Sequence, residues 1–361
     1  MPPPLEILFP AAGVVRRLVF SAQGRREPFP TPWAYNTRTE DILTKRLRGG
    51  SFVGISAAAR VSPVYRDRAI TFATNVITAA RQGDSTDTSL SVDVSDTARP
   101  IIFQLALADT TGGTVVAVIP HKDAYLLCFT ATETWVLQGD PATGAMRRVS
   151  DEVGIVGADA WCVAHDTVYF LSSHGLYQLG ADGSGLQAVS EDRVPEELTG
   201  VADATCTLTY QHSDRGVYIH TTGQDWLYDI AREGFWPFDT STTDSHLLIG
   251  PLKLGNTDWQ GLIQTLHGIV AEGSATVNWR IVPGTTAEEA AANGKLAITA
   301  DLASNDYSSY VRGSGSWTAG RSSTERPRTS AMWAVIWLSS AGTWAYERIT
   351  MQIQRAGKWR A

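Results

Sequence analysis

Short apolar runs separated by turn residues fill the middle of the chain. Four such runs lie at residues 115–119, 124–129, 134–137 and 146–149, and four more at residues 160–164, 167–171, 175–179 and 186–189. Runs of this length, rich in β-branched and aromatic residues, predict β-strands. Four short strands within roughly 40 residues are the spacing of a propeller blade. We therefore expect a β-propeller-like meander, with a β-sandwich as the competing architecture.

The two ends of the chain have different patterns. Prolines at positions 2–4, 10, 28, 30 and 32 exclude a regular helix and predict an extended N-terminal arm. Only residues 286–293 are typical of a helix, which Gly294 would end. Strong strand patterns at 333–338 and 344–353 predict a β-sandwich-like sheet. The expected fold class is all-β, with an arm and first strands at 1–100, a propeller-like core at 101–272 and a C-terminal sheet domain at 273–361.

The charge is segregated along the chain. Residues 1–81 carry 12 Lys and Arg against 5 Asp and Glu, residues 82–310 carry 10 against 30, and residues 311–361 carry 8 against 2. Basic ends and an acidic middle indicate that these parts face different surroundings. Composition drift on solvated surfaces is the alternative interpretation.

The apolar segments indicate a soluble protein. No apolar secretory leader follows Met1, and the longest apolar run near the C-terminus, residues 331–338, is too short to span a membrane. We expect folding in a cytoplasm without membrane insertion. The three cysteines, Cys128, Cys162 and Cys206, lie in apolar strand-like runs, which predicts buried free thiols.

Motifs for catalysis, nucleotide binding and metal binding are missing from the sequence. No phosphate loop is present, the seven histidines are scattered, and the segment 182–185 (Asp-Gly-Ser-Gly) is typical of a turn. Adjacent acids such as Asp151 and Glu152 cannot face each other across a glycosidase cleft. We therefore expect no enzymatic activity, no catalytic residues, no cofactor and no metal. Distant acids brought together by a propeller would leave a glycoside hydrolase as a third hypothesis.

Several motifs resemble the tail nozzle proteins of bacteriophages, a group that includes tail tubular and packaged-DNA stabilisation proteins. Near the start these are LFPAAGV (8–14), PFPTPWA (28–34) and RLRGGS (46–51). In the middle they are PHKD (120–123), WVLQGDP (135–141) and YFLSSHGLY (169–177). The resemblance covers most of the chain, although residues 52–100 and 285–325 match weakly.

This resemblance implies a structural virion protein. It would form a ring of six identical subunits in a phage tail, below the portal and adaptor, assembled in the host cytoplasm. The ring would contact other tail proteins, retain the genome and then let the double-stranded DNA pass. No catalytic residues are implied by the family.

Two sets of residues follow as hypotheses about this ring. The basic arm would contact neighbouring subunits through Arg16, Arg17, Arg25, Arg26, Trp33, Asn36, Arg38, Arg46 and Arg48. Acidic residues would face the DNA channel and repel it, namely Asp140, Asp151, Glu152, Glu196 and Glu197. The alternative function is a carbohydrate-binding propeller, which would need exposed Trp and Tyr in shallow pockets.

Overall fold

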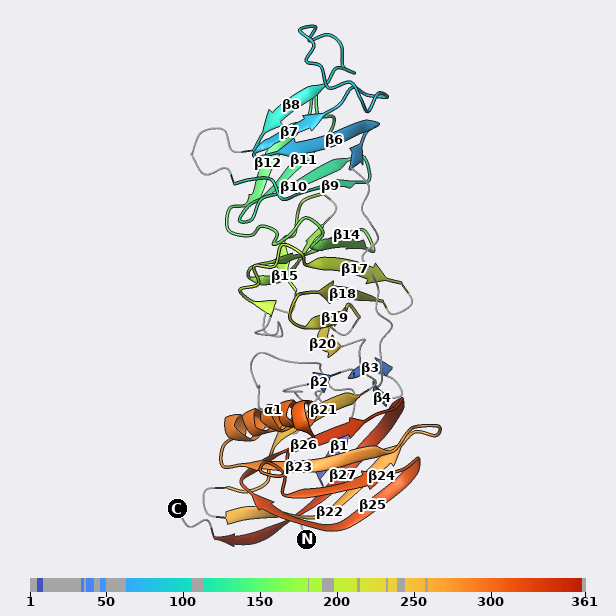
Figure 1. The fold of residues 1–361 in the computed structure, drawn as a ribbon, viewed down its shortest axis with the longest axis vertical. Coiled ribbons are helices and arrows are strands. Elements are labelled where there is room, and N and C mark those ends of the chain that lie inside the picture. Colours follow the sequence, from blue (N-terminus) through green and yellow to red (C-terminus); the bar gives the residue numbers. More distant parts are fainter. Residues whose placement is uncertain are drawn as a thin grey trace. The chain divides into compact units, whose positions relative to one another are not determined.

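The computed structural model describes residues 63–358 except 106–112, 181, 190–197, 213–214, 232, 239–243 and 257–258, together with the backbone of four strands nearer the N-terminus. The chain divides into two compact units, one of residues 55–225 and one of residues 1–54 and 226–361. The all-β class is confirmed, because strands dominate and the described residues contain a single α-helix (Figure 1).

Four antiparallel sheets of four strands each follow one another along the chain, as expected of propeller-like blades. The first contains β5 (Val64–Tyr65), β6 (Arg68–Ala73), β7 (Val76–Ala79) and β8 (Ile101–Gln104). The second contains β9 (Ala117–His121), β10 (Tyr125–Phe129), β11 (Thr134–Gln138) and β12 (Ala145–Ser150). The third contains β13 (Trp161–Ala164), β14 (Thr167–Ser172), β15 (Gly175–Gly180) and β16 (Gln187–Ala188). The fourth contains β17 (Thr207–Gln211), β18 (Gly216–His220), β19 (Asp225–Asp229) and β20 (Gly234–Phe238).

The sheets of the 55–225 unit bury their apolar faces against one another. Tyr65, Ile77 and Leu126 belong to one buried cluster that joins the first sheet to the second. The rings of Phe129 and Phe170 lie 4.8 Å apart and join the second sheet to the third. Because a four-stranded meander cannot bury a face on its own, each sheet is stabilised by its neighbour.

The first hairpin in each of the first three sheets turns through a basic residue followed by Asp. These pairs are Arg66-Asp67, Lys122-Asp123 and His165-Asp166, and all six residues have positive φ. A left-handed turn of this kind matches the twist of the hairpin, and Asp tolerates it better than most residues do. The sequence pattern of strands did not predict this repeat.

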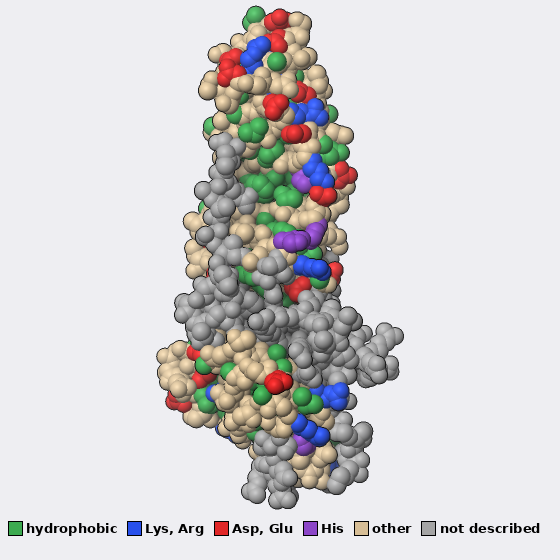
Figure 2. Space-filling view, turned by 90° about the vertical axis from the view of Figure 1, so that its right-hand side faces the viewer, with side chains coloured by type: hydrophobic (Ala, Val, Ile, Leu, Met, Phe, Trp, Pro, Cys, Tyr) green, Lys and Arg blue, Asp and Glu red, His purple; other side chains and the backbone are tan. Residues whose placement is uncertain are grey.

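These turns also connect neighbouring sheets. Nε of Arg66 donates to the carbonyl oxygen of Asp123 at 2.7 Å, and Nζ of Lys122 lies 2.7 Å from Oδ2 of Asp166. In each case the basic residue of one turn reaches the aspartate of the next turn. Figure 2 shows basic and acidic side chains close together along this face. The contacts therefore form a regular series that keeps successive sheets in register.

The second unit contains two sheets. One has the order β25-β22-β27-β4-β3, with β1 also paired to β27. Its strands are β1 (Leu5–Leu8), β3 (Thr37–Asp41), β4 (Arg46–Gly49), β22 (Trp259–Val270), β25 (Gly320–Ala331) and β27 (Trp344–Lys358). The other has the order β2-β21-β26-β23-β24. Its strands are β2 (Ala34–Tyr35), β21 (Ser245–Lys253), β23 (Val277–Gly284), β24 (Gly313–Trp317) and β26 (Trp333–Ser340).

Tryptophans pack against glycines in two ways here, between the two sheets at Gly268 and across neighbouring strands of one sheet at Gly315. A Cβ on Gly268 of β22 would lie 2.5 Å from the ring of Trp317, which projects from β24. A Cβ on Gly315 would lie 2.5 Å from the ring of Trp279. Each glycine therefore provides the space that a buried indole occupies, and the unit is sandwich-like as expected.

The helix α1 (Ala287–Ser304) covers the sheet of β21, β23 and β26. Thr286 is its N-cap, and the Thr286 side chain accepts a hydrogen bond from the backbone N–H of Glu289. The expected end at Gly294 is wrong, because the helix continues to Ser304. A Cβ at Gly294 would lie 2.9 Å from Leu248 and Val335, so this glycine lets the helix approach the sheet closely.

The three cysteines are free and buried, as expected. Burial raises the pKa of Cys206 to about 12, so its thiol stays protonated and unreactive at neutral pH. Among the described residues, no helix has both the length and the apolar character needed to cross a membrane.

Candidate functional site

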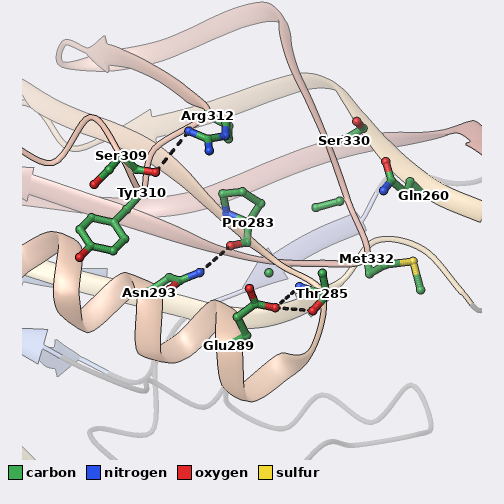
Figure 3. Close-up of a pocket in the computed structure, with 12 residues that line it drawn as sticks. Gln260, Pro283, Thr285, Glu289, Asn293, Ser309, Tyr310, Arg312, Ser330 and Met332 are labelled. Carbon is green, nitrogen blue, oxygen red and sulfur yellow. Dashed lines mark hydrogen bonds between the residues drawn. The ribbon is translucent and has the colours of Figure 1, made fainter. Parts of the chain in front are cut away.

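A polar pocket of about 390 Å³ lies in the second unit, beside the N-terminal half of α1. Its walls come from the end of β23, from α1, from the segment that follows α1, from the edge strand β25 and from its neighbour β22 (Figure 3). The lining residues are Gln260, Pro283, Gly284, Thr285, Glu289, Asn293, Ser309, Tyr310, Arg312, Ser330, Ala331 and Met332.

The first turn of α1 holds one carboxylate at this pocket. Oε2 of Glu289 accepts a hydrogen bond from the backbone N–H of Thr285 at 2.7 Å and another from the Thr285 hydroxyl. These hydrogen bonds lower the pKa of Glu289, the one from the Thr285 side chain most strongly. The carboxylate is therefore charged at neutral pH and fixed in position.

A cation lies on the segment that follows α1, and amides lie on α1 itself and on β22. Nη1 of Arg312 donates to the carbonyl of Ser309 at 3.3 Å, and Nδ2 of Asn293 donates to the carbonyl of Pro283 at 3.3 Å. The hydroxyl of Tyr310 and the carboxamide of Gln260 have no hydrogen-bond partner within the described part of the chain. Donors and acceptors on these walls thus remain available to a ligand.

This set of groups suits a polyhydroxylated ligand. A carboxylate accepts a hydrogen bond from a hydroxyl, a guanidinium donates one and an amide can do either, while a phenol ring offers an apolar face to a sugar ring. Within the described part of the chain, Glu289 is the one carboxylate that lines the pocket. The paired carboxyl groups of a typical glycosidase are therefore not assembled by the residues that line it.

The sequence did not predict this pocket. The Thr286…Glu289 spacing is a recognisable capping signal, and it places Glu289 at the helix start. Nothing in the local sequence marks Gln260 or Arg312, because they join the pocket only when separate strands and the helix come together.

The residues predicted for subunit contacts lie outside the part whose side chains the structure describes. Trp33, Asn36 and the arginines at positions 16, 17, 25 and 26 are outside the described residues altogether. The backbone of Arg38 lies in β3 opposite Arg48 of β4, and Arg46 begins β4. Their proposed role stays a prediction.

Among the predicted channel acids, Asp140, Asp151 and Glu152 are described, and they lie in loops and bends of the first unit. Oδ1 of Asp140 accepts from the backbone N–H of Ala142 at 2.8 Å and lies 3.7 Å from the buried guanidinium of Arg68. Oδ2 of Asp151 lies 3.8 Å from Arg148. These two carboxylates therefore have partners within the chain.

For Glu152, no side-chain partner is found among the described residues. Glu152 is exposed, and its backbone N–H donates to the hydroxyl of Ser150 at 3.2 Å. Glu196 and Glu197 are outside the described residues. The channel assignment of all five acids stays a prediction.

An exposed aromatic group adjoins the turn at His165. The hydroxyl of Tyr210 lies 2.8 Å from Nε2 of His165, and the ring of His212 lies 6.3 Å from that of His165.

Within the described ranges, no group of three or more His, Cys, Asp or Glu has metal-binding geometry. The turn at Asp182 is as expected, with Oδ1 accepting from the backbone N–H of Ser184 at 2.9 Å.

The comparisons with known proteins give matches among solved structures alone. No family model matches the chain, and no curated protein matches it. Among solved structures, it is similar to an exo-β-1,3-galactanase from Phanerochaete chrysosporium determined with galactose. The identity is 10%, the match covers 84% of this chain and 100% of that chain, and the TM-score is 0.26.

This match corrects one expectation. The galactanase is a glycoside hydrolase, which contradicts the expectation that the chain has no enzymatic activity, and that expectation is withdrawn. A TM-score of 0.26 is too low for the likeness to carry an argument about the pocket or about individual residues.

Proposed function

We propose that this chain is a structural subunit of a bacteriophage tail, forming a ring below the portal and adaptor through which the genome is retained and then conducted. The observation that carries the proposal is the series of four-stranded antiparallel sheets in chain order. In the first unit these sheets pack face to face through buried clusters such as the one around Tyr65, Ile77 and Leu126. The nozzle-like motifs at residues 46–51, 120–123 and 135–141 support the same function.

The rigidity of the stacked sheets and the negative charge of the middle of the chain both suit a DNA conduit. Sheets that are buried on one another resist bending, which suits a wall around a conduit under pressure. The middle of the chain, residues 82–310, has 30 acidic against 10 basic residues. Like charge would keep DNA sliding, over a range of about 8 Å at physiological salt. A ring of identical subunits then needs a head-to-tail interface that closes.

The mass of the assembled particle tests this proposal. Native mass spectrometry and negative-stain imaging of the full chain, alone and with a portal–adaptor complex, should give a closed ring of identical subunits with a central channel. A particle that stays monomeric under both conditions would exclude the proposal.

A second candidate function is carbohydrate binding, and the pocket at Glu289 and Arg312 favours it. A glycan array of the full chain should then show selective binding that Arg312→Ala and Glu289→Gln abolish. Arg321→Ala is the matched control, since Arg321 is exposed and does not line the pocket. Release of reducing sugar from the bound glycans, measured in the same samples, distinguishes binding from hydrolysis. Binding that survives both pocket variants would exclude this site.

A further inference from the structure

An exposed apolar strip lies on the loop between β7 and β8. Leu90, Val92 and Val94 are 68%, 100% and 77% exposed and alternate with Ser91 and Asp93. Isolated exposed apolar residues are ordinary, but three within five consecutive positions make this part of the loop an apolar strip, even though Val92 lies at a bend and Val94 in a turn. The loop lies beyond β8 at the upper end of the view in Figure 1.

The base of this loop is firmly held. The buried guanidinium of Arg68 donates to the carbonyl oxygens of Thr97 at 2.6 Å, Arg99 at 2.7 Å and Ala98 at 3.2 Å. Nη2 of Arg81 lies 2.8 Å from Oδ2 of Asp96. The apolar strip is therefore presented to solvent by an anchored loop, which lowers the entropy cost of binding a partner.

The loop is also acidic. Between β7 and β8 it holds Asp84, Asp87, Asp93 and Asp96 against Arg81 and Arg99, and Arg81 is already paired with Asp96. Hydrogen bonds from the side chains of Thr86 and Ser95 lower the pKa of Asp84 and Asp93, so both are charged at neutral pH. Figure 2 shows acidic side chains together with basic ones at this end of the unit. A partner for this surface must combine apolar side chains with positive charge.

One segment of the same chain has that chemistry. The sequence of residues 13–27, GVVRRLVFSAQGRRE, contains four arginines and five large apolar residues against one glutamate. We propose that the 82–98 loop is a docking surface for residues 13–27 of a second copy of the chain. The proposal rests on the ring proposed above and identifies one of its subunit contacts.

Photocrosslinking on the full chain tests this contact. p-Benzoylphenylalanine replaces Val92, whose side chain is fully exposed and should tolerate the change. Chains labelled with ¹⁴N and ¹⁵N are mixed, assembled and irradiated. Crosslinks from position 92 to residues 13–27 of a differently labelled chain are expected. The same reagent at Leu90 is a second variant, and at Leu302, which is exposed on α1, it is the control that should give no such crosslink.

Charge is tested separately with Asp84→Asn and Asp93→Asn together. Asparagine keeps the oxygen that accepts the turn hydrogen bonds while it removes the charge. Each of these charges contributes modestly to the attraction between the loop and residues 13–27. Removing both should lower the crosslink yield about fivefold at low salt. An unchanged yield would overturn the role of charge in the proposal.

Three other crosslinking results would count against the docking surface. Crosslinks only within one chain, crosslinks from one 82–98 loop to another, or no crosslink to residues 13–27 in assembled rings would each overturn the docking surface. In those cases the ring itself, seen by native mass spectrometry, would still support the tail function. A monomer that forms no ring would instead overturn the proposed function.

Discussion

At the scale of single residues, the buried charge of Arg68 has the clearest structural role. Its side chain is fully buried, and its guanidinium donates to four backbone carbonyls, including that of Ala80 at 2.9 Å. A buried cation is tolerated when acceptors and an opposite charge surround it. Both terminal nitrogens of Arg68 have acceptors and Oδ1 of Asp140 lies 3.7 Å away, whereas Nε has no hydrogen-bond partner among the described residues. Arg68 thus links β6 to the start and the end of the 82–98 loop.

Replacing Arg68 by Met should therefore lower the stability of the unit markedly. The carbonyls of Thr97, Ala98 and Arg99 would lose their donor while the side-chain volume stays similar, and we expect the free energy of unfolding to fall by about 3 kcal/mol. Chemical denaturation measures this change. Arg147→Met is the control, because Arg147 is exposed and donates a single hydrogen bond. A loss of stability as small as that of the control would show that the carbonyls find other donors.

His246 predicts a pH dependence of stability. Burial, followed by the positive charge of Arg280, lowers the pKa of His246 to about 3. Its Nδ1 accepts a hydrogen bond from Nε1 of Trp337 at 3.2 Å, which requires the neutral ring. In the unfolded chain His246 titrates near pH 6.5, so its contribution to stability is complete above that value and is lost as the pH falls towards 3.

Denaturation curves between pH 7 and pH 4 should show this loss, with a slope of up to about 1.4 kcal/mol per pH unit from this residue. In His246→Gln the amide oxygen can still accept from Trp337, but it binds no proton. The slope of this variant should be shallower than that of the wild type. Equal slopes would mean that His246 does not drive the pH dependence.

At the scale of elements, glycines decide how closely neighbouring segments pack. Gly268 in β22 lies under the ring of Trp317, and Gly294 lets α1 approach β21 and β26. In both places an apolar side chain from a different element fills the space beside the glycine. These glycines are needed for the space that the missing side chain leaves, and not for the backbone conformations that glycine favours.

Gly268→Ala should therefore be more costly than an exposed Gly→Ala change. The added Cβ would overlap the Trp317 ring, and overpacking of this kind costs about 1–3 kcal/mol. The fluorescence of the buried tryptophans should shift at the same time. Gly223→Ala is the control, since a Cβ there would meet only Thr221 at 3.9 Å. A neutral Gly268→Ala would indicate that the two sheets can separate without cost.

At the scale of the whole molecule, the segregation of charge leads to a prediction about assembly. The basic N-terminal 81 residues and the acidic residues 82–310 of neighbouring copies attract each other in the proposed ring. Raising the salt concentration from about 0.05 M to about 0.5 M should dissociate rings, because screening shortens the range of the attraction. Sedimentation at both salt concentrations measures this, with circular dichroism as the control that the subunits stay folded. Rings that persist unchanged at high salt would point to an apolar interface.

The local pattern of the sequence was sufficient for much of the fold. The strands expected at 124–129, 134–137 and 167–171 correspond to β10, β11 and β14, because alternating apolar residues and turn residues act over a few positions. The all-β class and the buried cysteines follow from the same local information.

Tertiary structure determined the length of the helix, the burial of Arg68 and the pocket. The local pattern ended the helix at Gly294, whereas packing against Leu248 and Val335 extends it to Ser304. The burial of Arg68 and the joining of Gln260, Glu289 and Arg312 in one pocket depend on contacts between segments far apart in the sequence. Hydrophobic periodicity determines which face of a strand is buried, but only the assembled sheets determine what that face meets.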